Sequence, residues 1–146
     1  MRRIALYLLL VLAAITCWGK DESVEELKAR LDRAPAEERT ELCIRIAQHQ
    51  LRHADGLYHD GNVEAGKAAV DDLVVYAEKA RDFAIQTKKR LKNVEIDARK
   101  MSERLRDLKQ TLAAEDQPPI DQAIKRLEDI RTDLLKEMFS KKKAKE

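Results

Sequence analysis

The sequence predicts an all-α protein, an elongated helical bundle or coiled-coil-like rod, and three observations point to this class. The 146 residues are 38% charged and 4% aromatic, with only 4 Gly and 3 Pro. That composition favours long helices over a sandwich or a barrel. Apolar residues recur at helical spacing along most of the chain, and one stretch keeps them in heptad register. We therefore expect one helix of about 50 residues, about Asn62–Ala114, flanked by shorter antiparallel helices.

The first segment, residues 1–19, is expected to be a secretory signal peptide and not part of the fold. Arg2 and Arg3 form its basic start. The run from Ile4 to Ile15 then contains no polar residue except Tyr7, which is typical of such leaders. About 12 apolar residues are too few for a transmembrane helix, which needs ~20. The sequence therefore predicts a secreted or periplasmic protein with no transmembrane helix after cleavage.

Two cleavage sites remain open. Cys17-Trp18-Gly19 offers small residues at both positions required for a cut before Lys20. Ala14-Ile15-Thr16-Cys17 resembles the lipobox of bacterial lipoproteins, with Thr16 where that family has Gly or Ala. The resemblance implies that Cys17 carries lipid, becomes the mature N-terminus and anchors the protein to a membrane of the envelope.

Charge and motifs exclude several classes of function. Without Arg2 and Arg3 the chain has 27 basic and 27 acidic residues, so the net positive charge typical of nucleic-acid-binding proteins is absent and no nucleic-acid partner is expected. The sequence has no glycine-rich phosphate loop, no Gly-x-Ser-x-Gly and no Cys-x-x-Cys. Its carboxylates fall on polar helix faces, where they stay ionised. We expect no enzyme, no catalytic residues and no cofactor.

Two helices are predicted before the long one. Ser23-Val24-Glu25-Glu26 has the pattern of a capping box, and the helix that it starts ends near Arg33. Pro35 suits the first turn of a second helix that runs to about His59. Asp60-Gly61-Asn62 then predicts a turn, because glycine tolerates a positive φ.

The long helix is predicted from an uninterrupted apolar stripe. No Pro or Gly occurs between Lys67 and Gln117. The stripe is rich in alanine in its first half and in leucine, valine and methionine in its second, which predicts two different neighbours. Its members alternate in steps of 4 and 3: Leu73, Ala77, Ala80, Ala84, Thr87, Leu91, Val94, Ala98, Met101, Leu105, Leu108 and Leu112.

A last helix is predicted from about Ile120 to Phe139, after Pro118-Pro119. A connection of about 6 residues makes it antiparallel to the long helix. Residues 20–140 are thus expected to form a single helical domain. Residues 141–146 are expected to be a disordered basic tail, since they have no apolar anchor.

The second half of the stripe is predicted to be an interaction seam. A two-helix hairpin covers only one side of such a stripe, so a protein partner or a second copy of the chain is expected to cover the rest. The seam consists of Leu91, Val94, Met101, Leu105, Leu108 and Leu112. Protein–protein interaction or self-association is therefore the function that the sequence favours.

A basic surface gives a second functional hypothesis. Residues 20–41 hold 5 basic and 8 acidic residues, and residues 81–109 hold 10 and 5. The excess centres on Lys88, Lys89, Arg90 and Lys92. Such a surface can contact an anionic membrane or an acidic partner; the alternative is a solvated surface whose charges the acidic end compensates.

Histidine and cysteine spacing gives a third hypothesis. His49 and His53 stand four positions apart on one helix and can together chelate a divalent metal, although Gln50 replaces the glutamate of a metalloprotease motif. Cys43 lies among apolar helical positions and is expected to be a buried small side chain. The alternative for Cys43 is an intermolecular disulfide.

Overall fold

A computed structural model describes residues 22–143, and all its regular elements are helices, which confirms the all-α class. They are α2 (Val24–Arg33), α3 (Ala36–His59), α4 (Val63–Thr87), α5 (Leu91–Gln110), a short 3₁₀ turn η2 (Ala114–Asp116) and α6 (Pro118–Lys143). The predicted signal peptide, Cys17 and residues 144–146 lie outside the described residues. None of the helices between residues 22 and 143 is long and apolar enough to cross a membrane.

The first helices begin and end as their sequences predict. Ser23 accepts a hydrogen bond from the backbone of Glu26 and donates its own backbone N–H to the Glu26 carboxylate, which completes the capping box of α2. Pro35 is the N-cap of α3. Gly61, in the turn between α3 and α4, has a φ of 78°.

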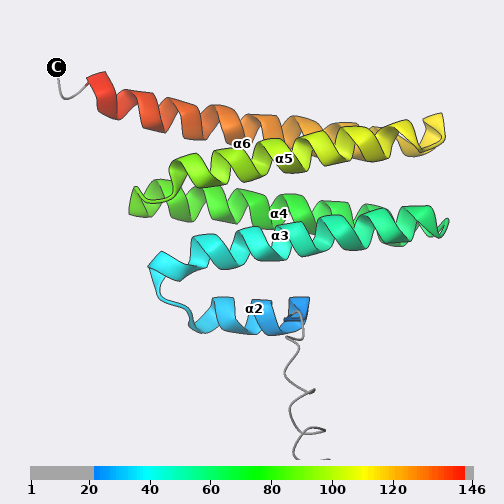
Figure 1. Cartoon of the computed structure of the whole chain (residues 1–146), viewed down its shortest axis with the longest axis horizontal. Coiled ribbons are helices and arrows are strands. Elements are labelled where there is room, and N and C mark those ends of the chain that lie inside the picture. Colours follow the sequence, from blue (N-terminus) through cyan, green and yellow to red (C-terminus); the bar gives the residue numbers. More distant parts are fainter. Residues whose placement is uncertain (1–21, 144–146) are drawn as a thin grey trace, which may run out of the picture.

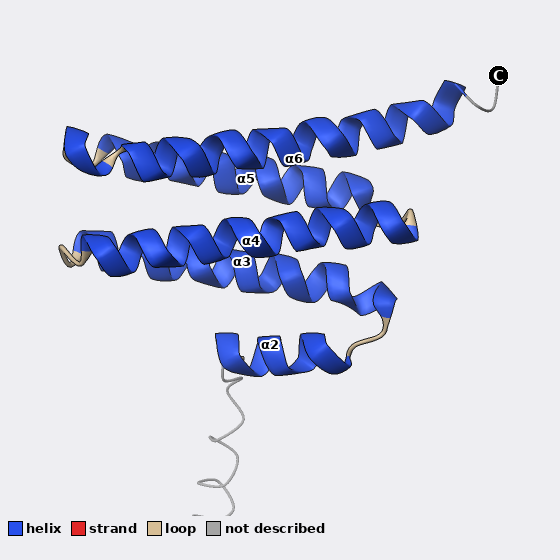
Figure 2. Cartoon of the chain, turned by 180° about the vertical axis from the view of Figure 1, so that it is seen from behind, coloured by secondary structure: helices blue, strands red, loops and turns tan. Residues whose placement is uncertain are grey.

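Four long helices form an antiparallel bundle. In Figure 1 the chain runs back and forth through α3, α4, α5 and α6, and Figure 2 shows the same order from behind, with α2 beside α3. The Lys28 side chain of α2 also reaches α4, where it pairs with Asp72 at 2.9 Å. The two hairpins, α3–α4 and α5–α6, are the most closely packed pairs. Between the hairpins, α4 packs on α6, whereas α3 and α5 share few contacts. The α4–α6 side of the bundle is therefore tight and the α3–α5 side is open.

The core runs the full length of the bundle. It contains Leu42, Ile46 and Cys43 from α3, and α6 contributes Leu127 and Leu134. From α4 the core receives small side chains, Ala77, Ala80 and Ala84, which are at most 1% exposed, and α3 and α4 form the most closely packed pair of helices. At the far end of this pair the ring of Tyr58 lies over Gly66, and a Cβ there would be 2.8 Å from two ring carbons.

The prediction of one helix of about 50 residues is wrong. The chain reverses at residues 88–90, so α4 and α5 are separate antiparallel helices and the molecule is a folded bundle, not a rod (Figure 1). Lys88 and Arg90 take left-handed conformations, with φ of 57° and 62°. Neither residue is a glycine or an asparagine, so the sequence carries none of the usual signals for such a turn.

Burial explains why the chain reverses without a turn signal. Left-handed backbone costs a non-glycine residue about 1–2 kcal/mol. Each large apolar side chain taken from water gains about 1.5–3 kcal/mol, and folding α5 back places several of them in the interior. Of the twelve stripe positions, ten are buried, and Thr87 and Leu112 are partly buried. The stripe thus identified core residues correctly, although it runs along two helices instead of one.

The last helix is longer than predicted. It begins at Pro118 and continues to Lys143, into the segment expected to be a disordered tail. Proline is tolerated there because the first N–H groups of a helix have no intrahelical partner. As the antiparallel pairing predicts, α6 runs back along α5, and its C-terminal end projects beyond the α4–α5 turn (Figures 1 and 2).

Candidate interaction surfaces

The predicted interaction seam lies inside the bundle. Leu91, Val94, Met101, Leu105 and Leu108 are between 0% and 7% exposed, and Leu112 is partly buried. The helix α6 covers them from one side, and α3 and α4 approach from the other. In this fold the seam is therefore occupied by the chain itself, and a partner could reach it only if the bundle opened.

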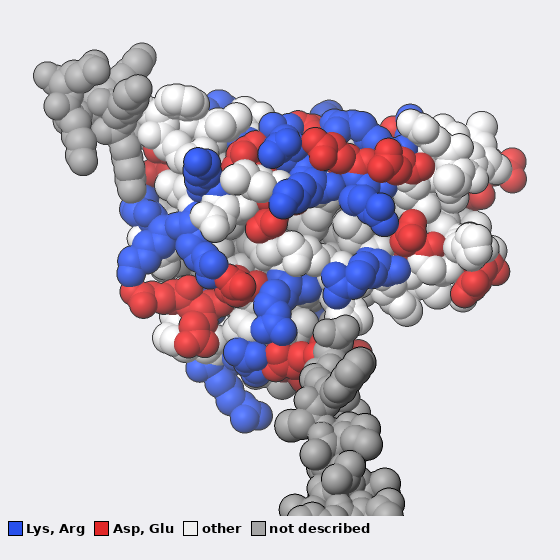
Figure 3. Space-filling view, viewed as in Figure 1, with Lys and Arg blue, Asp and Glu red and all other residues white. Residues whose placement is uncertain are grey.

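The predicted basic surface is largely neutralised by ion pairs. Lys88 pairs with Glu137 of α6, while Lys89 and Arg90 pair with Glu37 and Glu41 at the start of α3. The acidic N-terminal region thus lies against the basic turn. Figure 3 accordingly shows blue and red side chains interspersed over this face of the bundle. These contacts favour a solvated surface whose charges are compensated over a surface that binds an anionic membrane or an acidic partner.

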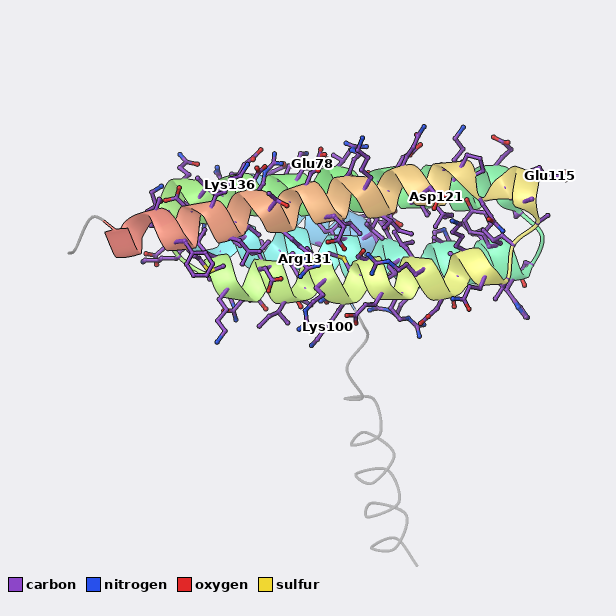
Figure 4. The ribbon with its side chains drawn as sticks, turned by 90° about the horizontal axis from the view of Figure 1, so that it is seen from above. Glu78, Lys100, Glu115, Asp121, Arg131 and Lys136 are labelled. Atoms are coloured by element: carbon purple, nitrogen blue, oxygen red, sulfur yellow. The ribbon has the colours of Figure 1, made fainter. Side chains whose placement is uncertain are left out.

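Ion pairs hold α6 on two sides, one to α4 of the other hairpin and one to α5 of its own hairpin. Arg126 donates two hydrogen bonds, of 3.0 and 2.8 Å, to the carboxylate of Glu78 on α4. On the other side, Arg131 donates to Glu95 of α5 at 2.9 Å. Figure 4 shows this division, with Glu78 on one side of α6 and Arg131 between α6 and α5.

The open side of the bundle holds a polar groove. This α3–α5 groove has a volume of about 290 Å³. Most of its lining is polar or charged, in contrast to the apolar core behind it. The lining residues are Thr40, Glu41, Ile44, Arg45 and Gln48 from α3, Arg90 from the turn, and Asn93, Val94 and Asp97 from α5.

Asp97 is the most perturbed carboxyl group in the groove. It is partly buried, and its recorded hydrogen bond is a long one of 3.4 Å, donated by the amide of Gln48. Burial raises the pKa of Asp97 above its ordinary value, and Glu41 adds to the rise. Lys100 and Arg90 act in the opposite direction. A hydrogen-bond donor brought into the groove would therefore find an under-satisfied acceptor.

A smaller pocket on α3 contains one of the two predicted metal ligands. His49 lines it together with Glu22, Arg45 and Arg52, and its volume is about 140 Å³. Within the described part of the chain, the buried Nδ1 atom of His49 has no hydrogen-bond partner. His53 is exposed on the next turn.

The surroundings of His49 and His53 do not favour a cation. Between residues 22 and 143, no cluster of three or more His, Cys, Asp or Glu side chains could hold a metal ion. A metal at this pair would have two protein ligands, whereas sites of useful affinity have three or four. Arg45 and Arg52 beside His49 add repulsion.

Cys43 is buried, as predicted. Its side chain is 0% exposed, and burial raises the pKa of the thiol to about 12. The neutral thiol packs as a small apolar side chain. An intermolecular disulfide would require α3 to leave the core.

The C-terminal part of α6 carries an exposed apolar pair that sequence reasoning missed. Leu135 and Phe139 are 36% and 63% exposed and stand four positions apart, on one side of the helix. The sequence pattern assigned this segment only its core stripe, and the pair becomes visible once the bundle shows which side of α6 is left uncovered. The groove was missed for the same reason, because it depends on α3 and α5 lying side by side.

Comparison with known protein families, curated proteins and solved structures finds no match for this chain.

Proposed function

We propose that this is a secreted or periplasmic non-catalytic protein that binds another protein through the α3–α5 groove. The observation that carries the proposal is the groove itself: the open α3–α5 side of the bundle presents polar groups around an under-satisfied carboxyl group. The seam that the sequence favoured is buried, so it offers no external surface. The leader lies outside the described residues, and the compartment therefore rests on its sequence.

The groove favours a partner that supplies a hydrogen-bond donor. Asp97 lines the groove together with two arginines that are already engaged: Arg45 pairs with Glu22, at 3.1 Å, and Arg90 with Glu41. A lysine, arginine or amide side chain of the partner could donate to Asp97 without displacing either pair. Burial of such a contact makes it a strong determinant of specificity, because a partner without the donor leaves the carboxylate unpaired.

Site-specific cross-linking tests the proposal. A photo-reactive residue placed at Asn93, an exposed groove position, should yield a discrete cross-linked protein in envelope extract. The same residue at Asp71, exposed on α4, is the matched control and should not. Asp97→Asn, introduced alongside the Asn93 label, should reduce the yield by about tenfold, the effect of losing one charge-assisted hydrogen bond. Equal yields from Asn93 and Asp71, or no effect of Asp97→Asn, would contradict the groove as the binding surface.

A lipid surface is less well supported than a protein partner. That alternative depended on Lys88, Lys89, Arg90 and Lys92. The fold pairs the first three with acidic side chains, and Lys92 is exposed on the first turn of α5. Anionic vesicles added to the cross-linking reaction provide a direct comparison. Competition by vesicles at low salt that disappears at high salt would favour the lipid alternative.

A further inference from the structure

The α4–α5 turn combines two properties that are seldom found together. It reverses the direction of the chain, and yet the heptad phase of the apolar stripe is the same before and after it. Ala84, Thr87, Leu91 and Val94 are separated by steps of 3, 4 and 3, which place them on one face of a continuous helix. If residues 88–90 were helical, α4 and α5 would join into a single helix with one unbroken stripe.

The residues of the turn are also poorly suited to the backbone conformation that it requires. Lys88 and Arg90 have positive φ values of 57° and 62°, which side chains with a Cβ disfavour. No side chain caps the start of α5, so its first N–H groups have no intrahelical partner. In a continuous helix all three turn residues would take right-handed geometry, and those N–H groups would bond to the last carbonyls of α4.

We propose that residues 88–90 are a hinge at which two copies of this chain exchange their α5–α6 hairpins. In the exchanged dimer α4 and α5 of each copy form one long helix. Each bundle then consists of the α3–α4 hairpin of one chain and the α5–α6 hairpin of the other. The α3–α5 groove is rebuilt from two chains, so this inference stands whether or not the groove binds the proposed partner.

The contacts of the bundle survive this exchange. The bonds within the α5–α6 hairpin, such as Arg131 to Glu95, move with it unchanged. The contacts between the hairpins, such as Arg126 to Glu78 and Arg81 to Asp133, form again between the two chains. What changes is the turn, and replacing a disfavoured turn by helix is the usual basis of such exchange.

The overhang of α6 gives an independent reason to expect a second copy. Two exchanged bundles meet at the ends where their α4–α5 turns were, and the projecting end of α6 lies at that same end (Figure 1). Phe139 lies just beyond Glu137, which pairs with Lys88 of the turn, and is 63% exposed in the single chain; Leu135, one helical turn earlier on the same side, is 36% exposed. At the junction of two bundles they gain apolar neighbours, which adds contacts that the single chain does not have.

Two matched variants test the hinge. Replacing Lys88, Lys89 and Arg90 by three alanines favours helix, whereas three glycines favour the left-handed turn. Both variants lose the same ion pairs. After refolding from urea at high concentration, sedimentation should show a dimer fraction at least about tenfold larger for the alanine variant than for the glycine variant. Equal fractions, or no dimer in the alanine variant, would overturn the proposal.

Isotope mixing then distinguishes exchange from ordinary association. Equal amounts of ¹⁴N- and ¹⁵N-labelled chain are refolded together, and the dimers are treated with a lysine cross-linker. Lys79 of α4 and Lys125 of α6 are the sequence neighbours of the paired Glu78 and Arg126, so we expect a lysine cross-linker to span them. Mixed-isotope Lys79–Lys125 links are expected, and links within single chains alone would overturn the proposal. If circular dichroism shows that the alanine variant does not fold, the mixed-isotope cross-linking is carried out on wild-type dimers instead. A wild-type chain that forms no dimer also overturns the proposal.

Discussion

Two of the turns that reverse this chain, α3–α4 and α4–α5, differ in how the sequence specifies them. The α3–α4 turn is Asp60-Gly61-Asn62, with glycine at a φ of 78°. The α4–α5 turn is Lys88-Lys89-Arg90, with left-handed lysine and arginine. The first turn is specified by the backbone preferences of its own residues. The second forms because the helices on both sides of it pack together. Local chemistry and tertiary packing can therefore each produce a reversal, and only the first kind is visible in the sequence.

The variant with the largest expected effect tests whether the helices joined by both turns share one packed core. Leu105, 0% exposed, lies on the stripe that would be half open in a rod. Leu105→Ala should lower the free energy of unfolding by about 2–5 kcal/mol, the range for a large side chain removed from a packed interior. Leu135→Ala, at a 36% exposed position, is the control and should cost less than about 1 kcal/mol. Urea denaturation measures both, and similar small losses would argue against the folded bundle.

The α3–α4 turn is tested by two glycines with opposite expectations. Gly61→Ala should destabilise by about 1–2 kcal/mol, because it forces a Cβ into a left-handed position. Gly56→Ala should stabilise by about 0.5–1 kcal/mol, because Gly56 lies inside α3 and an added Cβ has no atom within 4 Å. Thermal unfolding of the two variants should shift in opposite directions. A shift in the same direction would mean that the turn does not depend on Gly61.

The α4–α5 turn is tested by the same substitution at two lysines. Lys88→Gly should leave the free energy of unfolding unchanged or raise it by up to about 1 kcal/mol, since glycine relieves the left-handed strain. Lys136→Gly, at an exposed position inside α6, should lower it by about 1 kcal/mol. A continuous helix through residue 88 predicts losses at both positions, so equal destabilisation in urea would favour the rod.

The smallest expected effect concerns the groove wall that the second turn helps to build. Because burial raises the pKa of Asp97 in the folded state, the folded protein holds this proton more tightly than the unfolded chain. The tighter binding of the Asp97 proton raises the free energy of unfolding at acid pH, and this contribution is lost as pH rises through the raised pKa. Asp97→Asn removes this loss, so the variant should be slightly more stable than wild type at pH 7, and the difference should shrink towards pH 3. Asp107→Asn, at an exposed position on α5, is the control, and an Asp97→Asn difference independent of pH would contradict the assignment.

The sequence predicted most of the fold because most of it is encoded locally. The capping box at Ser23, the turn at Gly61 and the stripe from Leu73 to Leu112 all follow from neighbouring residues. The break at Lys88 could not be predicted, since no local signal marks it and the heptad phase continues across it. The α3–α5 groove depends on that break, because Asp97 faces α3 only after α5 has folded back.

One contact limits how this protein can vary. The ring of Tyr58 closes over Gly66, leaving 2.8 Å where a Cβ would stand. Every substitution at position 66 must push an aromatic ring out of the core, whereas position 56 is open. In a library of random variants selected for folding, almost every folded variant should thus have glycine at position 66. The few variants with another residue there should also be changed at position 58.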